Sequence, residues 1–293
     1  MCNLTLERAL FVKSQEIKTI QAGPTSIHVF HENAEDLAME PMMITQTPRS
    51  WAEWLDGKGP SVHEGEEIHY GVKGTIVDVC HDREYYLEQG DYFYFQGPKP
   101  HTWHNPGREP ARLFIILAPA LSARTRMREF GARSPEERTQ VQRENITKAP
   151  VLVRRKDFQS HTVAQTTIDF PTPGVKDQKA EIIVQTTGPK ARFEYTDGRG
   201  PFRHEGEEFL YVLEGALKAK IGNEVRVLDT GDYTYFPGTI PHEFENTGET
   251  PVKTLIGESP PITVRPDYYD HLNPEDREYA YKRMREFGIT PPG

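Results

Sequence analysis

The sequence contains two copies of one pattern, and this internal repeat limits the possible folds more than any other feature. DGKGPSVHEGEE at residues 56–67 matches DGRGPFRHEGEE at 197–208, and GDYFYFQGPKPHTWHN at 90–105 matches GDYTYFPGTIPHEFEN at 231–246. Both pairs share an offset of 141 residues. Solenoid repeats have periods of roughly 20 to 50 residues, so this period is too long for one. The chain is therefore expected to contain two copies of one domain in tandem.

Short runs of strand-forming residues between turn residues indicate an all-β fold. FLYVLEGALKAKI at 209–221 and LFIIL at 113–117 are rich in β-formers, and the chain has 23 Gly and 24 Pro. This pattern predicts antiparallel barrels or sandwiches. The sequence RMREFG occurs at 126–131 and 283–288, each time in a helix-like stretch, so accessory helices are expected after each barrel.

Composition and missing motifs exclude several classes of protein. A net charge of −9 without a long basic block argues against a nucleic-acid partner. No apolar run approaches the roughly 18 residues of a membrane helix, and the start of the chain lacks the pattern of a signal peptide. Two cysteines cannot form a disulfide framework, so a cytoplasmic protein is expected. Neither a phosphate loop nor a dinucleotide fingerprint occurs, so the chemistries that those motifs carry are not expected.

In both copies a His is followed four residues later by a Glu, and a second His comes later. Residues four apart on a strand face the same side, so these groups can converge inside a barrel. Two His and one carboxylate with open positions are typical of non-haem Fe(II) oxygenases. Fe(II) is the expected metal, and Zn, Mn, Ni or Co could occupy the same groups. The predicted ligands are His63, Glu67, His101, His204, Glu208 and His242.

The motifs that carry these residues resemble those of the cupin superfamily. HEGEEFLYVLEG at 204–215 resembles the first cupin motif and 231–246 resembles the second, while the first copy matches more loosely. The resemblance implies a bicupin, with two antiparallel jelly-roll barrels in one chain. The common motif begins His-x-His, but Ser61 and Phe202 stand at the first His position here. The remaining set is similar to iron enzymes of the hydroxypropylphosphonate epoxidase type, which implies a mononuclear iron site that uses O2 or peroxide without an organic cofactor.

The expected organisation follows from the repeat and the helix-like stretches. An N-terminal barrel over 1–120 is followed by a helical linker over 121–150. A C-terminal barrel over 151–262 is followed by a helical tail over 263–293. The barrel edges and terminal helices provide pairing surfaces, so a homodimer is expected.

The two pockets are expected to differ in polarity. By strand alternation His69 and Ser61 share a side with Glu67, whereas Leu210 and Phe202 stand at their counterparts. His69 and Ser61 are therefore the candidate catalytic residues. His69 could be a general acid/base, a substrate hydrogen-bond donor, an extra metal ligand or a histidine bonded to a barrel carbonyl. The candidate substrate-binding residues are Trp103, Trp54, Arg192, Phe202 and Phe244.

These features lead to one expected function and two alternatives. The expected function is that of an Fe(II)-dependent oxygenase or oxidase that acts with O2 on a small organic molecule. The first alternative is a non-redox isomerase, lyase or decarboxylase that uses the metal as a Lewis acid. The second is a small-molecule-binding bicupin without turnover. One barrel fold hosts many chemistries, so the sequence does not identify the substrate.

Overall fold

The computed structural model describes residues 8–31, 37–53, 60–120, 149–171, 178–193, 201–204 and 206–261, and positions 175, 274, 277, 278 and 281. The chain forms two compact units. One unit is Ile17–Asp157, called the N-terminal barrel below. The other consists of Met1–Glu16 and Phe158–Gly293 and is called the C-terminal barrel.

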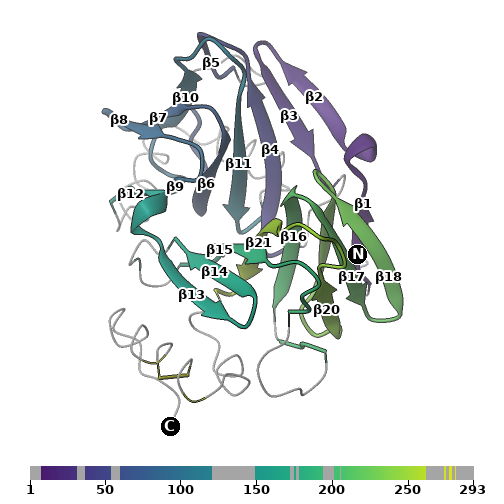
Figure 1. The fold of residues 1–293 in the computed structure, drawn as a ribbon. Helices are drawn as coiled ribbons and strands as arrows, with labels where there is room; N and C mark the ends of the chain where they lie inside the picture. Colours follow the sequence, from purple (N-terminus) through teal and green to yellow (C-terminus); the bar gives the residue numbers. More distant parts are fainter. Residues whose placement is uncertain are drawn as a thin grey trace, which may run out of the picture. The chain divides into compact units, whose positions relative to one another are not determined.

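Two antiparallel sheets make up the N-terminal barrel (Figure 1). The larger has the strand order β12-β9-β6-β11-β4-β3-β2, and the smaller has the order β5-β10-β7-β8. The strands are β2 (Lys18–Ala22), β3 (Thr25–Val29), β4 (Glu40–Gln46), β5 (Ser50–Trp51), β6 (Glu66–Lys73), β7 (Ile76–Cys80), β8 (Arg83–Leu87), β9 (Tyr92–Gln96), β10 (His101–Asn105), β11 (Ala111–Ala118) and β12 (Val151–Val153).

The C-terminal barrel repeats this plan. Its larger sheet has the order β1-β19-β16-β21-β15-β14-β13, and its smaller sheet has the order β18-β17-β20. The prediction of two antiparallel jelly-roll barrels is therefore confirmed. The strands are β1 (Leu10–Val12), β13 (Gln159–Val163), β14 (Thr166–Phe170), β15 (Glu181–Thr187), β16 (Glu207–Glu214), β17 (Ala216–Ile221), β18 (Glu224–Asp229), β19 (Tyr233–Pro237), β20 (His242–Glu245) and β21 (Val252–Ser259).

Each barrel is filled by apolar side chains that alternate along its strands with residues of the opposite face. Phe93, Phe95 and Trp103 are buried in the core of the N-terminal barrel. Phe236 and Phe244 occupy the core of the C-terminal barrel. Full burial of a large apolar side chain stabilises a fold by about 1.5–3 kcal/mol, so these rings hold the strands beside them firmly in place.

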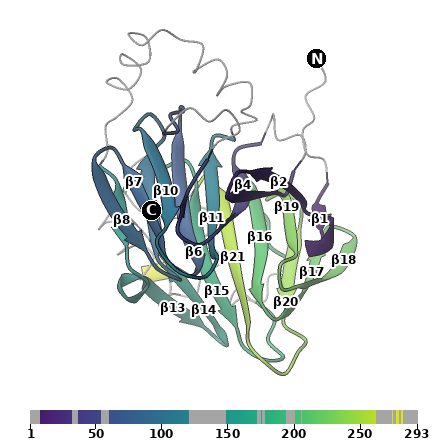
Figure 2. The ribbon, with the colours of Figure 1, turned by 90° about the horizontal axis from the view of Figure 1, so that it is seen from above.

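Each barrel takes one short strand from the other copy of the repeat. β1 pairs antiparallel with β19 in the C-terminal barrel, and Figure 2 shows the dark purple β1 among green strands. β12 pairs with β9 in the N-terminal barrel. β1 and β12 stand at equivalent positions of the repeat, so the exchange is reciprocal. The grouping therefore differs from the expected division of the chain: residues 1–16 join the second barrel, and residues 151–157 join the first. Hydrogen bonds to an edge strand, rather than order in the sequence, determine where these segments belong.

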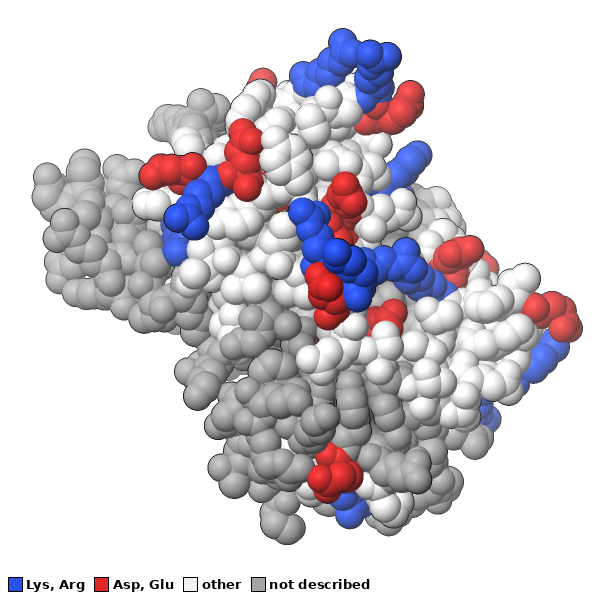
Figure 3. Space-filling view, turned by 60° about the vertical axis from the view of Figure 1, so that its left-hand side comes forward, with Lys and Arg blue, Asp and Glu red and all other residues white. Residues whose placement is uncertain are grey.

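The expected helical linker and tail fall largely outside the described residues. Within the tail, the described positions Pro274, Arg277, Glu278 and Tyr281 have helical backbone. In the part of the chain that the structure describes, no helix has both the length and the apolar character needed to cross a membrane. On the face shown in Figure 3, the coloured Lys and Arg side chains lie among Asp and Glu side chains.

Candidate metal centres

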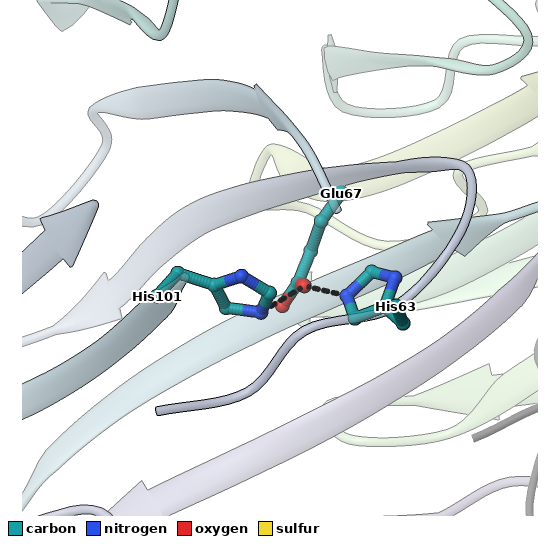
Figure 4. A group of neighbouring side chains, drawn as sticks. All are labelled: His63, Glu67 and His101. Carbon is teal, nitrogen blue, oxygen red and sulfur yellow. Dashed lines mark hydrogen bonds and ion pairs between the residues drawn. The ribbon is translucent and has the colours of Figure 1, made fainter. Parts of the chain in front are cut away.

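Three side chains from separate elements meet in the N-terminal barrel (Figure 4). His63 precedes β6, Glu67 lies on β6, and His101 begins β10. The Nε2 atoms of His63 and His101 lie 2.7 and 3.1 Å from the same Glu67 oxygen, Oε2. All three side chains are buried. The predicted first ligand set is thus brought together around one point.

Backbone carbonyls determine the tautomers of both histidines. His63 Nδ1 lies 2.9 Å from the carbonyl oxygen of Glu64, and His101 Nδ1 lies 2.7 Å from that of Lys99. A carbonyl oxygen can only accept, so each Nδ1 donates its hydrogen. In the neutral imidazole Nε2 then has a lone pair, and both Nε2 atoms face Glu67. Metal-binding histidines are oriented by this kind of second hydrogen bond.

The chemistry of this donor set fits a divalent transition metal. Two Nε2 lone pairs and a carboxylate oxygen that face one another repel unless a cation lies between them. His101 Nε2 is buried and makes no hydrogen bond in the described structure. Burial raises the pKa of Glu67, but the positive charges of His101 and His69 in their protonated forms outweigh burial and hold the pKa well below its usual value. The carboxylate is therefore ionised and suited to a metal.

The backbone leaves room for the first histidine only because a glycine faces it. A Cβ added at Gly97, which follows β9, would overlap the imidazole of His63. Gly238 has the same relation to His204 in the other barrel. The glycine of each second motif thus serves the ligand of the first motif.

The C-terminal barrel brings together the second predicted set. His204 Nε2 lies 2.8 Å and His242 Nε2 lies 3.5 Å from Glu208 Oε2. His242 Nδ1 donates to the carbonyl oxygen of Ile240 at 2.8 Å. The two barrels therefore present the same three donors in similar arrangements.

The centres differ in what surrounds the glutamate. In the N-terminal barrel His69 Nε2 lies 2.6 Å from the other Glu67 oxygen, Oε1, and His69 Nδ1 lies 2.8 Å from Asp78 Oδ1. Burial alone would lower the pKa of His69, but the carboxylates of Asp78 and Glu67 raise it to about 10. His69 is therefore a proton-carrying bridge between two carboxylates. Strand alternation predicted that His69 faces the barrel interior, whereas Asp78 was not among the predicted site residues.

Trp103 stands on the wall beside this bridge. It is directly across the β7–β10 pair from Asp78, and its ring lies edge-to-face with His69 at 5.8 Å. Its Nε1 donates to Gln46 Oε1 at 3.1 Å, and Thr25 donates to the same oxygen at 2.8 Å. With its indole N–H already bonded, Trp103 presents its ring rather than a donor to the interior.

The remaining candidate residues lie at varying distances from the metal groups. Ser61 is buried and forms a backbone bridge with His101. The rings of Phe202 and Phe244 lie 5.8 and 5.9 Å from that of His242. Arg192 is half exposed and lies 3.9 Å from Glu243, so it takes part in a surface ion pair. Trp54 lies outside the described residues.

Comparison with known proteins agrees with this geometry. Residues 56–117 and 191–257 match the cupin domain family, one match in each barrel. With one cupin-domain match and one His/Glu/His group in each of its two barrels, the chain has the two-domain arrangement of a bicupin.

The similar proteins are related distantly. The chain is 33% identical over 90 residues to the uncharacterized protein MJ1618 of Methanocaldococcus jannaschii. The aligned region covers 31% of this chain and 66% of that relative. AerE from Microcystis aeruginosa has a TM-score of 0.61 at 16% identity, covering 85% of this chain and 98% of AerE. Oxalate decarboxylase OxdC from Bacillus subtilis has a TM-score of 0.64 at 14% identity, covering 88% of this chain and 78% of OxdC. These two structures share the fold.

Proposed function

We propose that this bicupin is an Fe(II)-dependent oxygenase or oxidase that acts with O2 on a small organic molecule. The observation that carries the proposal is the convergence of two Nε2 atoms and one carboxylate oxygen in each barrel. Two His and one carboxylate form one face of a metal's coordination shell and leave other positions open. When bound there, Fe(II) supplies a redox-active centre with open positions for O2 and substrate.

The N-terminal barrel is the proposed place of reaction, because its interior combines polar groups with aromatic walls. Ser61 is the group we assign to hydrogen bonding with substrate, since it is buried beside the ligand His101, whereas both ring nitrogens of His69 are bonded to carboxylates. Trp103 and Phe95 border His69 at 5.8 and 5.2 Å and exclude water from it. In the C-terminal barrel Leu210 and Phe244 make the corresponding walls apolar.

The Asp78–His69–Glu67 bridge favours a second candidate, a non-redox lyase, isomerase or decarboxylase. His69 holds its proton between two carboxylates, and a proton held this way can be delivered to a carbon or oxygen of a bound substrate. The metal would then act as a Lewis acid. The similar Bacillus subtilis oxalate decarboxylase has Mn(II) centres, so a cupin of this kind can carry a metal other than iron.

Substrate-dependent O2 uptake distinguishes these functions. The full chain is loaded anaerobically with Fe(II), Mn(II) or Zn(II) and mixed with a panel of small hydroxy acids, oxo acids, dicarboxylates and phenols. O2 consumption and products are then measured. Uptake that requires Fe(II) and one class of compound, and that is lost in His63→Ala, supports the oxygenase.

The same panel decides against the proposal in two ways. Equal product formation without O2, with Zn(II) or Mn(II) in place of iron, establishes the non-redox enzyme instead. Retention of a compound without turnover by any metal form establishes a binding protein. The matched control is His81→Asn, which changes an exposed histidine outside both ligand groups. Asn tolerates the left-handed backbone at this turn.

A further inference from the structure

We propose that Asp78 and His69 are positioning residues that commit Glu67 to bind metal through a single oxygen, so that the two metal centres of this chain are chemically different. The inference rests on the metal binding assumed in the proposed function, but it does not depend on which reaction occurs. It concerns two polar residues of the N-terminal barrel whose equivalent positions in the C-terminal barrel hold Leu210 and Ala219.

The two oxygens of Glu67 have separate partners. Oε2 faces His63 Nε2 at 2.7 Å and His101 Nε2 at 3.1 Å, whereas Oε1 receives the Nε2 hydrogen of His69 at 2.6 Å. A carboxylate whose second oxygen accepts a short hydrogen bond is held as a ligand through the first. One-oxygen binding leaves one more coordination position open than binding through both oxygens.

His69 is itself fixed from three sides. Asp78 Oδ1 accepts its Nδ1 hydrogen at 2.8 Å. The rings of Phe95 and Trp103 lie edge-to-face with the imidazole at 5.2 and 5.8 Å. The imidazole therefore cannot turn away from Glu67 without losing a charge-assisted hydrogen bond and two ring contacts.

Asp78 is costly to the fold, which argues against a merely structural role. It is 2% exposed, and its Oδ2 makes no hydrogen bond among the described residues. Burying a carboxylate with an unsatisfied oxygen destabilises a protein, and an apolar residue of matching shape is often better for stability. The C-terminal barrel has apolar side chains at these two positions: Leu210 and Ala219 stand where the first barrel has His69 and Asp78.

Because Leu210 and Ala219 are apolar, the hydrogen bonds available to Glu208 differ from those available to Glu67. Glu208 Oε2 faces His204 Nε2 at 2.8 Å and His242 Nε2 at 3.5 Å, as in the first barrel. Neither Leu210 nor Ala219 can donate a hydrogen bond to its carboxylate. The positions that supply the His69–Asp78 pair in the first barrel therefore hold no hydrogen-bonding side chain in the second.

Cobalt(II) titration of the full chain tests the proposal. The background His204→Ala leaves the N-terminal group as the one intact His/Glu/His set of the described residues. In it, His69→Leu and Asp78→Ala are expected to weaken Co(II) binding by about 10- to 100-fold, the usual effect of losing a partner of a metal ligand. Both are also expected to change the visible absorption of bound Co(II), because the number of carboxylate oxygens on the metal changes. Asp78→Asn keeps an acceptor for His69 and should restore most of the wild-type spectrum.

The matched control uses the other barrel. In the background His63→Ala, which leaves the C-terminal group intact, His69→Leu should change neither the affinity nor the spectrum of Co(II). Circular dichroism checks that each variant folds, and Leu fits because the equivalent position already holds Leu210. If Asp78→Ala does not fold, His69→Leu and Asp78→Asn still decide the question.

Other outcomes overturn the proposal, and they can be told apart from failure of the proposed function. Unchanged affinity and spectrum in folded His69→Leu overturn the positioning role and leave the oxygenase standing. The expected dependence on His69, with no turnover by any metal form, supports the positioning role and overturns the oxygenase. No Co(II) binding by the folded His204→Ala protein overturns the positioning role and the placement of the reaction in the N-terminal barrel.

Discussion

Lys13 Nζ lies 2.6 Å from Asp232 Oδ2, although the two residues are 219 positions apart in the sequence. Asp232 is 1% exposed, and it also accepts the backbone N–H of Ser14 at 2.8 Å and that of Asp229 at 2.7 Å. This single carboxylate therefore fastens the segment that enters the C-terminal barrel from the start of the chain. Asp91, its repeat counterpart, binds the segment that enters the N-terminal barrel.

The first prediction concerns Asp232 and stability. Asp232→Ala leaves the backbone N–H groups of Ser14 and Asp229 without this acceptor and removes one of the acceptors of Lys13, and is expected to lower the free energy of unfolding by about 2–4 kcal/mol. Lys13→Ala removes a partly exposed partner and should cost at most about 1 kcal/mol. Urea unfolding of the full chain measures both. Equal costs for the two variants would show that the buried carboxylate does not hold the segment.

The repeat made the two-barrel fold predictable. The exchange of β1 and β12 between the barrels could not be predicted from the sequence. LFV at Leu10–Val12 and VLV at Val151–Val153 are nearly interchangeable sequences. Strand pairing uses backbone groups that are the same in every residue, so either segment suits either edge. The aspartates that fasten them, Asp91 and Asp232, belong to the repeated GDY motif. In the sequence this motif indicates only a turn.

The second prediction concerns metal content. After anaerobic Fe(II) loading, elemental analysis of the wild type is expected to give about two equivalents per chain, because both His/Glu/His groups present converging donors. His63→Ala and His204→Ala should each retain about one. A single equivalent that disappears in one variant and persists in the other would mean that one barrel keeps the motif without a metal.

The ligand sets were accessible from the sequence because the same His and Glu spacing recurs in both copies, although His63 and His204 precede their strands and strand alternation does not explain their direction. The role of Asp78 could not be predicted from the sequence, because it depends on the pairing of β7 with β10 and on the direction of His69. A clue was nonetheless present in the repeat. The positions of His69 and Asp78 change together, to Leu210 and Ala219, as expected for two side chains in contact.

The third prediction uses the two glycines beside the histidine ligands. Gly97→Ala places a methyl group in the space of the His63 imidazole, which must then move away from Glu67. We expect loss of the N-terminal equivalent of metal with retention of the other, measured by elemental analysis as above. Gly238→Ala should do the reverse through His204, so each variant is the control for the other. Full metal content in both would show that the loops adjust without cost to the ligands.

The fourth prediction concerns stability in acid and a histidine that belongs to neither His/Glu/His group. His31 is buried, and burial lowers its pKa to about 4. The unfolded chain, with a pKa near 6.5, therefore takes up this proton before the folded chain does as the pH falls. The contribution of His31 to the free energy of unfolding is fully present above the pKa of the unfolded chain. It is lost as the pH falls from 6.5 to 4, and the loss from this residue is at most about 3 kcal/mol.

A variant without an ionisable group at this position isolates that contribution. The free energy of unfolding of His31→Gln, subtracted from that of the wild type, should fall by about 3 kcal/mol between pH 7 and pH 4, because all other titrations cancel in the difference. Urea unfolding of metal-free protein at four pH values supplies the numbers. A difference that stays constant with pH would mean that the His31 imidazole becomes protonated in the folded state as readily as in the unfolded chain.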